Sequence, residues 1–183
     1  PSLEGFLFPG QYEIKRDIQP EELVLVFLER FDEEVTTETI EAIQNQGLSL
    51  YEGVILASII QRETFMDDER AMMASVFYNR LAAGTRLETD PTVQYALGYS
   101  EKWGNWWKTP LKSGDLGVDS PFNTYLYSGL PPRPISNPDL PSILAVAYPE
   151  ESDFYYFRAL CDQSGYHDFS KTYEEHLSKS CDD

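Results

Sequence analysis

Apolar side chains in the first half of the chain recur every three or four residues, which is the spacing of a helix that buries one face. A first helix is predicted from Pro20, a residue suited to the first turn, because the period continues through Phe31. Gly47 and Gly84 are suited to end helices, and Ser49 with a Glu three residues later is typical of a capping box. Three further helices are therefore predicted over residues 37–46, 49–64 and 67–83.

Short extended segments broken by Pro and Gly are predicted in the rest of the chain. Residues 5–14 are predicted to form two short strands around a Pro-Gly turn, and residues 122–130 another strand before a rigid Pro-rich loop. A hairpin is predicted around Gly165, from residues 154–160 and 166–169. Short helices are predicted to open at Pro91, to cover residues 140–147 and to follow Thr172. The predicted fold class is α+β, with a helix-rich first half and short strands and hairpins at the start and in the second half.

The composition narrows the classes of protein. The 183 residues are enough for one domain with a buried core, and 42% of them are hydrophobic. Fourteen basic and 31 acidic side chains give a net charge of −17, which argues against binding nucleic acid or an anionic lipid surface. A carbohydrate substrate is compatible with this charge. No apolar run approaches the ~20 residues of a membrane span. The chain begins with Pro1 instead of Met, so we expect it to be a piece of a longer protein.

Cysteines and histidines are few. Cys161 and Cys181 would pair in an oxidising compartment and stay reduced in the cytosol, and their spacing alone does not decide between the two. His167 and His176 are the only histidines, and no HExxH, GxxxxGK[ST] or GxGxxG motif is present. The sequence therefore predicts no metal and no cofactor, and it argues against a metalloprotease, a P-loop NTPase and a Rossmann oxidoreductase.

One acid continues the apolar stripe of the predicted 49–64 helix instead of facing water. Leu56, Ile59 and Ile60 occupy positions i, i+3 and i+4, and Glu63 follows at i+7. Burial and the negative end of the helix dipole both raise the pKa of such a carboxyl group, as a general acid working near neutral pH requires. The alternative is that the helix frays here and that Glu63 is solvated or pairs with an arginine.

Other polar and aromatic positions allow a functional and a structural interpretation. Glu88 and Asp90 lie on one side of an extended segment, but Asp90 before Pro91 also suits a helix N-cap. His167 is expected to make a structural hydrogen bond, because no Cys or acid is spaced to form a triad with it. A group of three tryptophans could stack on a sugar or anchor a loop: Trp103, Trp106 and Trp107.

Several stretches follow one known order of motifs. Residues 3–9 (LEGFLFP) and 57–64 (ASIIQRET) are similar to LEGFLFPDTY and ASIVEKET, and residues 74–81 (ASVFYNRL) and 87–93 (LETDPTV) to VASVFxNRL and LQTDPTV. Residues 120–125 (SPFNTY) and 129–135 (GLPPRPI) match SPYNTY and GLPPGPI, and the closing GYHDF and EH match GxHxF and EH. Over nearly the whole chain, these stretches resemble the catalytic domain of the YceG-like endolytic murein transglycosylases.

The resemblance implies a lytic transglycosylase that cleaves MurNAc–GlcNAc bonds inside peptidoglycan strands, leaves 1,6-anhydro-MurNAc ends and so terminates glycan polymerisation. Glu63 would be the catalytic acid, and Gln61, in place of the family's first acid, leaves Glu63 as the only carboxylate of its motif. The sugar's own C6 hydroxyl would be the nucleophile, so a second carboxylate is not required. Polar members of the matching motifs are expected to bind substrate: Asn79, Arg80, Glu88, Asp90, Thr92, Asn123, Thr124 and Tyr125.

The resemblance also implies the setting of the protein. Residues 1–183 would form a single catalytic domain on the extracytoplasmic face of the bacterial cell membrane, lacking the upstream membrane helix and LysM-like domain of full-length relatives. Its partners would be glycan strands and cell-wall synthases, and it would contact the membrane only through the missing anchor. Two alternatives stay open. One is a hydrolytic muramidase, in which Glu88 (a Gln in the family) or Asp90 is a second carboxylate. The other is a non-catalytic peptidoglycan-binding module.

Overall fold

The computed structural model describes residues 2–102 and 104–181 of the chain. The α-helices are α1 (Pro20–Glu34), α2 (Thr37–Asn45), α3 (Leu50–Glu63), α4 (Arg70–Ala82), α5 (Asp90–Leu97), α6 (Leu140–Ala147) and α7 (Tyr173–Ser178). The two 3₁₀ turns are η1 (Asp67–Glu69) and η2 (Asp115–Gly117), and the strands are β1 (Tyr156–Ala159) and β2 (His167–Ser170). The strands form one antiparallel pair, with Tyr156 opposite Ser170. The α+β class is confirmed.

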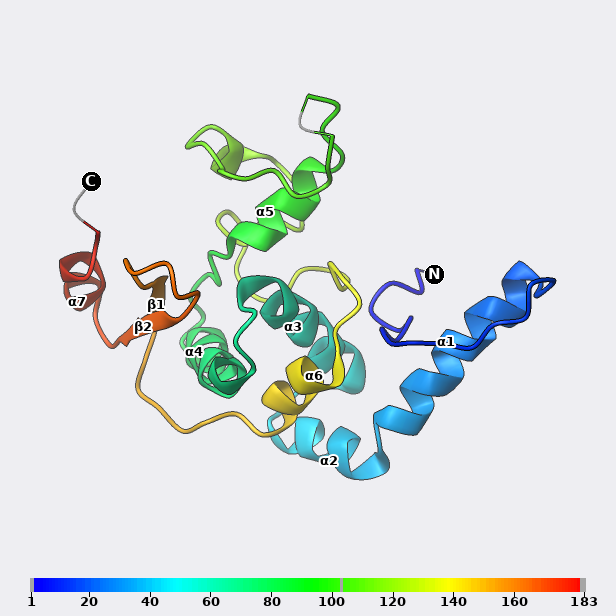
Figure 1. The fold of residues 1–183 in the computed structure, drawn as a ribbon. Helices are drawn as coiled ribbons and strands as arrows, with labels where there is room; N and C mark the ends of the chain where they lie inside the picture. The colour runs from blue at the N-terminus through cyan, green and yellow to red at the C-terminus, as the bar shows by residue number, and fades with distance from the viewer. Residues whose placement is uncertain (1, 103, 182–183) are drawn as a thin grey trace.

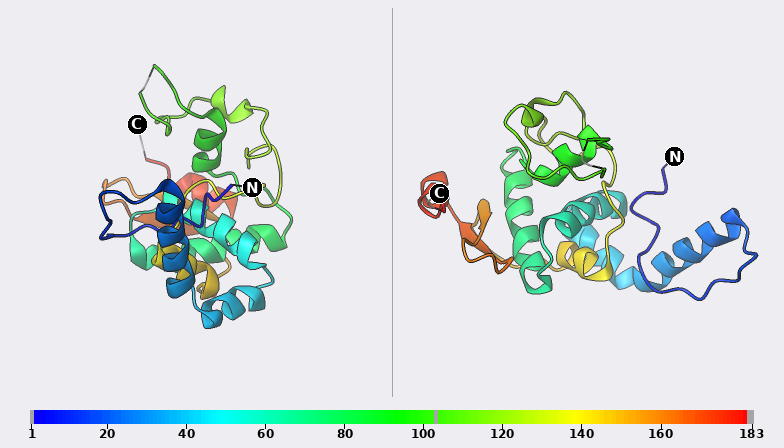
Figure 2. Two further views of the ribbon diagram at one scale, coloured as in Figure 1. Left: turned by 90° about the vertical axis from the view of Figure 1, so that its right-hand side faces the viewer. Right: turned by 45° about the horizontal axis from the view of Figure 1, so that its top comes forward.

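The elements surround α3, which lies near the centre of the molecule (Figure 1). Helices α2, α4, α5 and α6 contact it. Helix α1 projects on one side and the β1–β2 hairpin with α7 on the other, while α5 and the loops that follow it form a third projection (Figure 2). In the part of the chain that the structure describes, no helix is long and apolar enough to cross a bilayer.

The central helix is buried on all sides over most of its length. Every residue from Gly53 to Ile60 is buried, although the apolar spacing alone predicted a single buried face. The capping box is present as predicted: the Ser49 side chain accepts a hydrogen bond from the Glu52 amide, and Glu52 accepts from the Ser49 amide at 2.8 Å. Burial on every side fixes the position of the residue that ends the helix, Glu63.

Polar groups also hold α3 in place. The Ser58 hydroxyl donates to the Ile55 carbonyl at 2.7 Å and accepts from the Ile135 amide at 3.0 Å. One turn later, Gln61 Oε1 accepts from the Asp139 amide at 2.8 Å. Gln61 thus satisfies a backbone donor just before α6, where the first amides of a helix lack partners within it.

Three predicted strands, in two segments, are wrong, because a side chain in one segment and turns in the other satisfy the backbone in place of a neighbouring strand. In residues 5–14, the amides of Gly5 and Leu7 both donate to Asn137 Oδ1, at 2.7 and 3.3 Å, and no strand forms. In residues 122–130 the chain makes turns, in which the amides of Leu126 and Tyr127 donate to the Asn123 carbonyl. Both arrangements depend on partners that an alternating sequence pattern does not reveal.

The other predicted elements are confirmed, with small shifts at their ends. The helix predicted over 67–83 begins as the 3₁₀ turn η1 and becomes α-helical at Arg70. Its start is held by the Arg70 guanidinium, which is 5% exposed, lies 3.0 Å from the Asp67 carboxylate and also contacts Asp139. The hairpin, the helix after Thr172 and the helices near Pro91 and over residues 140–147 form as predicted.

Gly5 is a position where only glycine fits, which gives a first prediction. Its φ is +94°, and a Cβ there would lie 2.5 Å from Pro134 Cγ and 2.9 Å from Val54 Cγ1. We expect Gly5→Ala to lower the free energy of unfolding by about 2–4 kcal/mol, through backbone strain and overpacking. Gly10→Ala is the matched control, because its Cβ would meet nothing closer than 3.5 Å. Urea unfolding measures both variants, and equal midpoints would contradict the prediction.

Candidate active site

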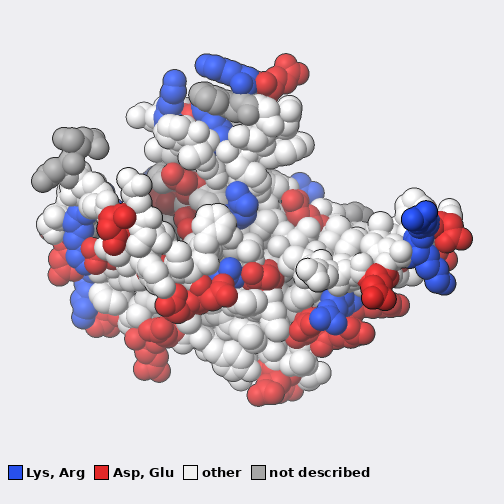
Figure 3. Space-filling view, in the orientation of Figure 1, with Lys and Arg blue, Asp and Glu red and all other residues white. Residues whose placement is uncertain are grey.

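A cleft of about 690 Å³ opens where the end of α3 meets α4, the segment before α5 and the C-terminal hairpin. Figure 3 shows the surface hollowed between the part that carries α5 and the C-terminal part. The lining includes five residues predicted from the sequence to act in the site, from four segments of the chain: Glu63, Arg80, Glu88, Asp90 and Tyr125. The structure thus brings together side chains up to 62 positions apart in the sequence.

Glu63 is the last residue of α3 and retains limited access to the cleft. Burial, and to a lesser extent the nearby negative charge of Asp90, raise the pKa of its carboxyl group to about 8, against the opposing effect of Arg80. The group is therefore mostly protonated at neutral pH and can donate a proton. Thr64 continues the chain in an extended conformation, so α3 ends at the cleft without fraying earlier.

Asp90 and Tyr125 form a hydrogen-bonded pair beside Glu63. The Tyr125 hydroxyl donates to Asp90 Oδ1 at 2.8 Å. Burial and this hydrogen bond both raise the pKa of Tyr125, so its hydroxyl stays protonated and can act as a donor. Thr89 occupies the N-cap position of α5 and Asp90 the first helical position. The alternative of Asp90 as a simple N-cap is therefore wrong: its side chain contacts Tyr125.

Glu88 brings a further carboxylate to the cleft through an unusual backbone. Its φ is +53°, a region that non-glycine residues rarely occupy. The amide of Glu88 donates to the Thr124 carbonyl at 3.2 Å, and its Oε2 lies 3.4 Å from the guanidinium of Arg80. Strained conformations of this kind persist where the surroundings dictate them, often at functional sites.

Arg80 ties the walls of the cleft together. Its guanidinium donates to the carbonyl of Tyr155 at 2.6 Å, just before the hairpin, and to that of Leu87 at 2.7 Å, just before Glu88. The group also lies 5.1 Å from the ring centre of Tyr156. The side chain is only 11% exposed. Through these hydrogen bonds it connects α4, the segment before α5 and the C-terminal hairpin.

The four other predicted substrate-binding residues do not line the cleft, and their side chains make hydrogen bonds within the protein. Asn79 donates to the carbonyls of Ser152 and Phe154, and Asn123 to those of Leu116 and Val118. Thr92 and Thr124 share a hydrogen bond of 2.8 Å between their hydroxyls and are almost completely buried. Asn79 thus holds the segment before β1, while Thr92, Asn123 and Thr124 hold the loops that carry Glu88, Asp90 and Tyr125.

The C-terminal hairpin and α7 contribute much of the cleft that the sequence analysis did not select. These lining residues are Tyr156, Phe157, Arg158, Ala159, His167, Tyr173 and His176. The matching GxHxF and EH motifs pointed to this segment, but nothing local indicated that it would face α3. The expected structural hydrogen bond of His167 is confirmed: its amide and Nδ1 contact the buried Glu69 carboxylate at 2.7 and 2.8 Å. His167 is also part of the cleft lining.

Trp106 and Trp107 do not line this cleft. Trp107 packs under the Arg62 guanidinium, 3.9 Å from the ring centre, and Trp106 is 62% exposed. Both line a separate pocket of about 540 Å³ with Glu4 and Tyr95. Trp103 lies outside the described residues. The described ranges hold no group of three or more His, Cys, Asp or Glu side chains arranged for a metal ion.

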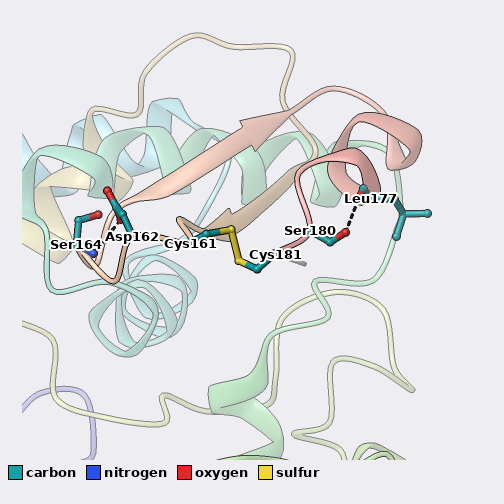
Figure 4. Close-up of a disulfide and its surroundings, with 6 residues drawn as sticks. All are labelled: Cys161, Asp162, Ser164, Leu177, Ser180 and Cys181. Atoms are coloured by element: carbon teal, nitrogen blue, oxygen red, sulfur yellow. Dashed lines mark hydrogen bonds between the residues drawn. A yellow bond between two sulfur atoms is a disulfide. The ribbon is translucent and has the colours of Figure 1, made fainter. Parts of the chain in front are cut away.

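Cys161 and Cys181 form a disulfide, which settles the question that their spacing left open (Figure 4). The bond joins the loop after β1 to the segment after α7, so it closes the hairpin and the last helix into one unit. Disulfides of this kind persist in oxidising compartments.

The comparisons with known proteins agree with this geometry. The family model of the YceG-like family matches residues 1–181. An endolytic murein transglycosylase of Bacillus subtilis strain 168 is 37% identical over 95% of this chain and 46% of its own length. One of Streptococcus pneumoniae strain D39 is 33% identical over 86% of this chain and 28% of its own length.

A crystal structure of a yceG-like protein from Listeria monocytogenes is 41% identical, with a TM-score of 0.84, over 97% of this chain and 55% of that one. The chain thus spans about half the length, or less, of the proteins it matches. Because the family model covers nearly every residue, the chain belongs to the YceG-like family.

Proposed function

We propose that this chain is the catalytic domain of an endolytic lytic transglycosylase. It cleaves MurNAc–GlcNAc bonds inside peptidoglycan strands, leaves 1,6-anhydro-MurNAc ends and so terminates glycan polymerisation. The observation that carries the proposal is a carboxyl group, Glu63, that stays protonated near neutral pH in a cleft of about 690 Å³. The names of the similar proteins from Bacillus subtilis and Streptococcus pneumoniae support the same reaction.

One carboxyl group can carry out both proton transfers. Glu63 donates its proton to the glycosidic oxygen as the bond from that oxygen to C1 of MurNAc breaks. The Glu63 carboxylate then takes the proton of the C6 hydroxyl of the same sugar, and O6 bonds to C1. Glu63 is neutral again and no water is consumed. The C6 hydroxyl is already tethered to the reacting sugar, which gives it a high effective concentration.

A hydrolytic muramidase is the second candidate, favoured by the position of Glu88 and Asp90 in the same cleft. A second carboxylate beside the general acid is what water-using glycosidases require as a base or nucleophile. The binding-module alternative predicts that purified cell walls bind the protein and release no fragments.

Mass spectrometry of the soluble fragments released from purified peptidoglycan separates these candidates. We expect the wild-type products to be about 18 Da lighter than hydrolytic muropeptides, because the C6 hydroxyl replaces one water. Fragments with reducing ends would instead establish a muramidase and direct attention to Glu88 and Asp90. The absence of any fragment would contradict both enzymatic proposals.

The proposal also covers the location of the protein. Peptidoglycan lies outside the cytoplasm, and the Cys161–Cys181 disulfide is of the kind found in oxidising compartments. We place the domain at the extracytoplasmic face of the cell membrane, anchored by an upstream segment and acting near the cell-wall synthases. The resemblance to the family supports both the anchor and the synthases.

A further inference from the structure

The cleft is lined by charged side chains of both signs, and Arg80 among them lies 3.4 Å from the Glu88 carboxylate. Glu63, Glu88 and Asp90 gather near the end of α3, where the proposed reaction takes place. The cleft wall formed by β1 and α7 contributes Arg158 and His176. Arg158 lines the cleft of a protein with a net charge of −17, whose visible surface is rich in acidic side chains (Figure 3).

Arg158 is a cation without a carboxylate partner among residues 2–102 and 104–181. Its guanidinium lies 3.4 Å from His176 Nε2, and no ion pair includes it. Asp168 lies opposite Arg158 in the β1–β2 ladder but approaches Lys179 instead, at 3.5 Å. The guanidinium is therefore available to an anionic group that enters the cleft.

The electrostatics at this wall are consistent with an anion site. Burial lowers the pKa of His176, and the positive charges of Arg158, Arg80 and Lys179 lower it further. The imidazole is consequently neutral at pH 7, and its Nε2 can accept a hydrogen bond from the Arg158 guanidinium and so orient that cation. Arg80 lies 3.4 Å from Glu88 and Lys179 lies 3.5 Å from Asp168, so Arg158 is the cation of the three whose charge no described carboxylate offsets.

The wall is also fixed in place before any ligand arrives. The Cys161–Cys181 disulfide ties the segment after α7 to the loop that follows β1 (Figure 4). Rings of Tyr156, Tyr173 and His176 pack together between the two elements. A preorganised cation loses little conformational entropy when it binds a ligand.

We propose that Arg158, with His176 beside it, binds a free carboxylate of the peptide stem attached to MurNAc, so that the cleft selects strands that carry stems. The inference rests on the proposed function, which places a glycan in this cleft. Stem peptides are the anionic parts of peptidoglycan that project from the sugar chain, and Arg recognises carboxylates in a bidentate geometry. A strand without stems carries lactyl carboxylates instead, held closer to the sugar ring.

Binding to the Glu63→Gln variant tests the inference without turnover. The probes are soluble glycan fragments with intact stems, the same fragments with their stem carboxylates amidated, and fragments stripped of stems by an amidase. Titration calorimetry should give about tenfold tighter binding for intact stems than for either other probe. Adding Arg158→Gln should remove most of this difference, and Arg158→Lys should retain part of it. Arg16→Gln makes an equal charge change at an exposed site that is far from Arg158 in the sequence. It should leave the difference in affinity between the probes intact.

Equal affinity for intact and amidated stems would overturn the inference, and so would an equal loss for all three probes in Arg158→Gln. Tightest binding of stripped fragments, dependent on Arg158, would assign the site to the lactyl carboxylate and overturn the stem assignment. Cleavage is scored separately with the wild-type protein. A stem preference in binding, together with no released fragments from the wild type, would refute the proposed function and leave the stem site standing.

Discussion

Replacing Glu63 with Gln is expected to reduce peptidoglycan cleavage by about 10²–10⁴-fold, the range that general acid catalysis contributes. The amide keeps the size of the side chain but has no proton to give to the leaving oxygen, and afterwards it cannot accept the proton of the C6 hydroxyl. Because Glu63 follows directly on the buried part of α3, an isosteric replacement is needed to separate chemistry from packing.

The measurement is the rate at which soluble fragments appear from purified peptidoglycan, with equal amounts of folded variant and wild-type protein. Glu29→Gln is the matched control, because Glu29 is exposed on α1 and does not line the cleft. That variant should cleave at the wild-type rate. Cleavage by Glu63→Gln within a few-fold of wild type would remove Glu63 from the mechanism.

The same substitution is expected to stabilise the fold in alkaline solution. The pKa of Glu63 is about 8 in the folded protein and about 4.3 in an unfolded chain. Between these values the folded state holds a proton that the unfolded state has released, so wild-type stability falls as the pH rises through this window. A neutral Gln has no such dependence. At pH 9, Glu63→Gln should therefore gain about 2–4 kcal/mol of stability relative to its difference from wild type at pH 4.

Chemical denaturation of both proteins at pH 4, 7 and 9 measures this difference. Other groups titrate over the same range, but their contributions cancel between variant and wild type. Glu29→Gln should show no comparable change with pH, since exposed groups gain little from folding. A constant difference between Glu63→Gln and wild type would mean that the carboxyl is not buried in a way that penalises its charge. Loss of activity with a gain of stability would be typical of an acid retained for function.

The sequence by itself determined the helices, because each depends on signals close along the chain. Apolar spacing, the Ser49 capping box and glycines at helix ends specify local hydrogen bonding and one buried face. The hairpin around Gly165 depends in the same way on local turn chemistry. The strands predicted over 5–14 and 122–130 did not form, because Asn137 in one case and turns around Asn123 in the other satisfy those backbones.

The same distinction between local sequence signals and long-range packing applies to the candidate site. Glu63 could be selected from the sequence because its position in the apolar stripe of one helix already implied burial, and the family motifs pointed to the same residue. Only the tertiary structure decided its neighbours: Asp90 raises the pKa of Glu63, and Arg80 joins Leu87 to Tyr155. Periodicity reports how one element meets the core, whereas a cleft is made where distant elements meet. Arg158 lies on a hairpin far from α3 in the sequence, so its position in the cleft wall depends on long-range packing alone.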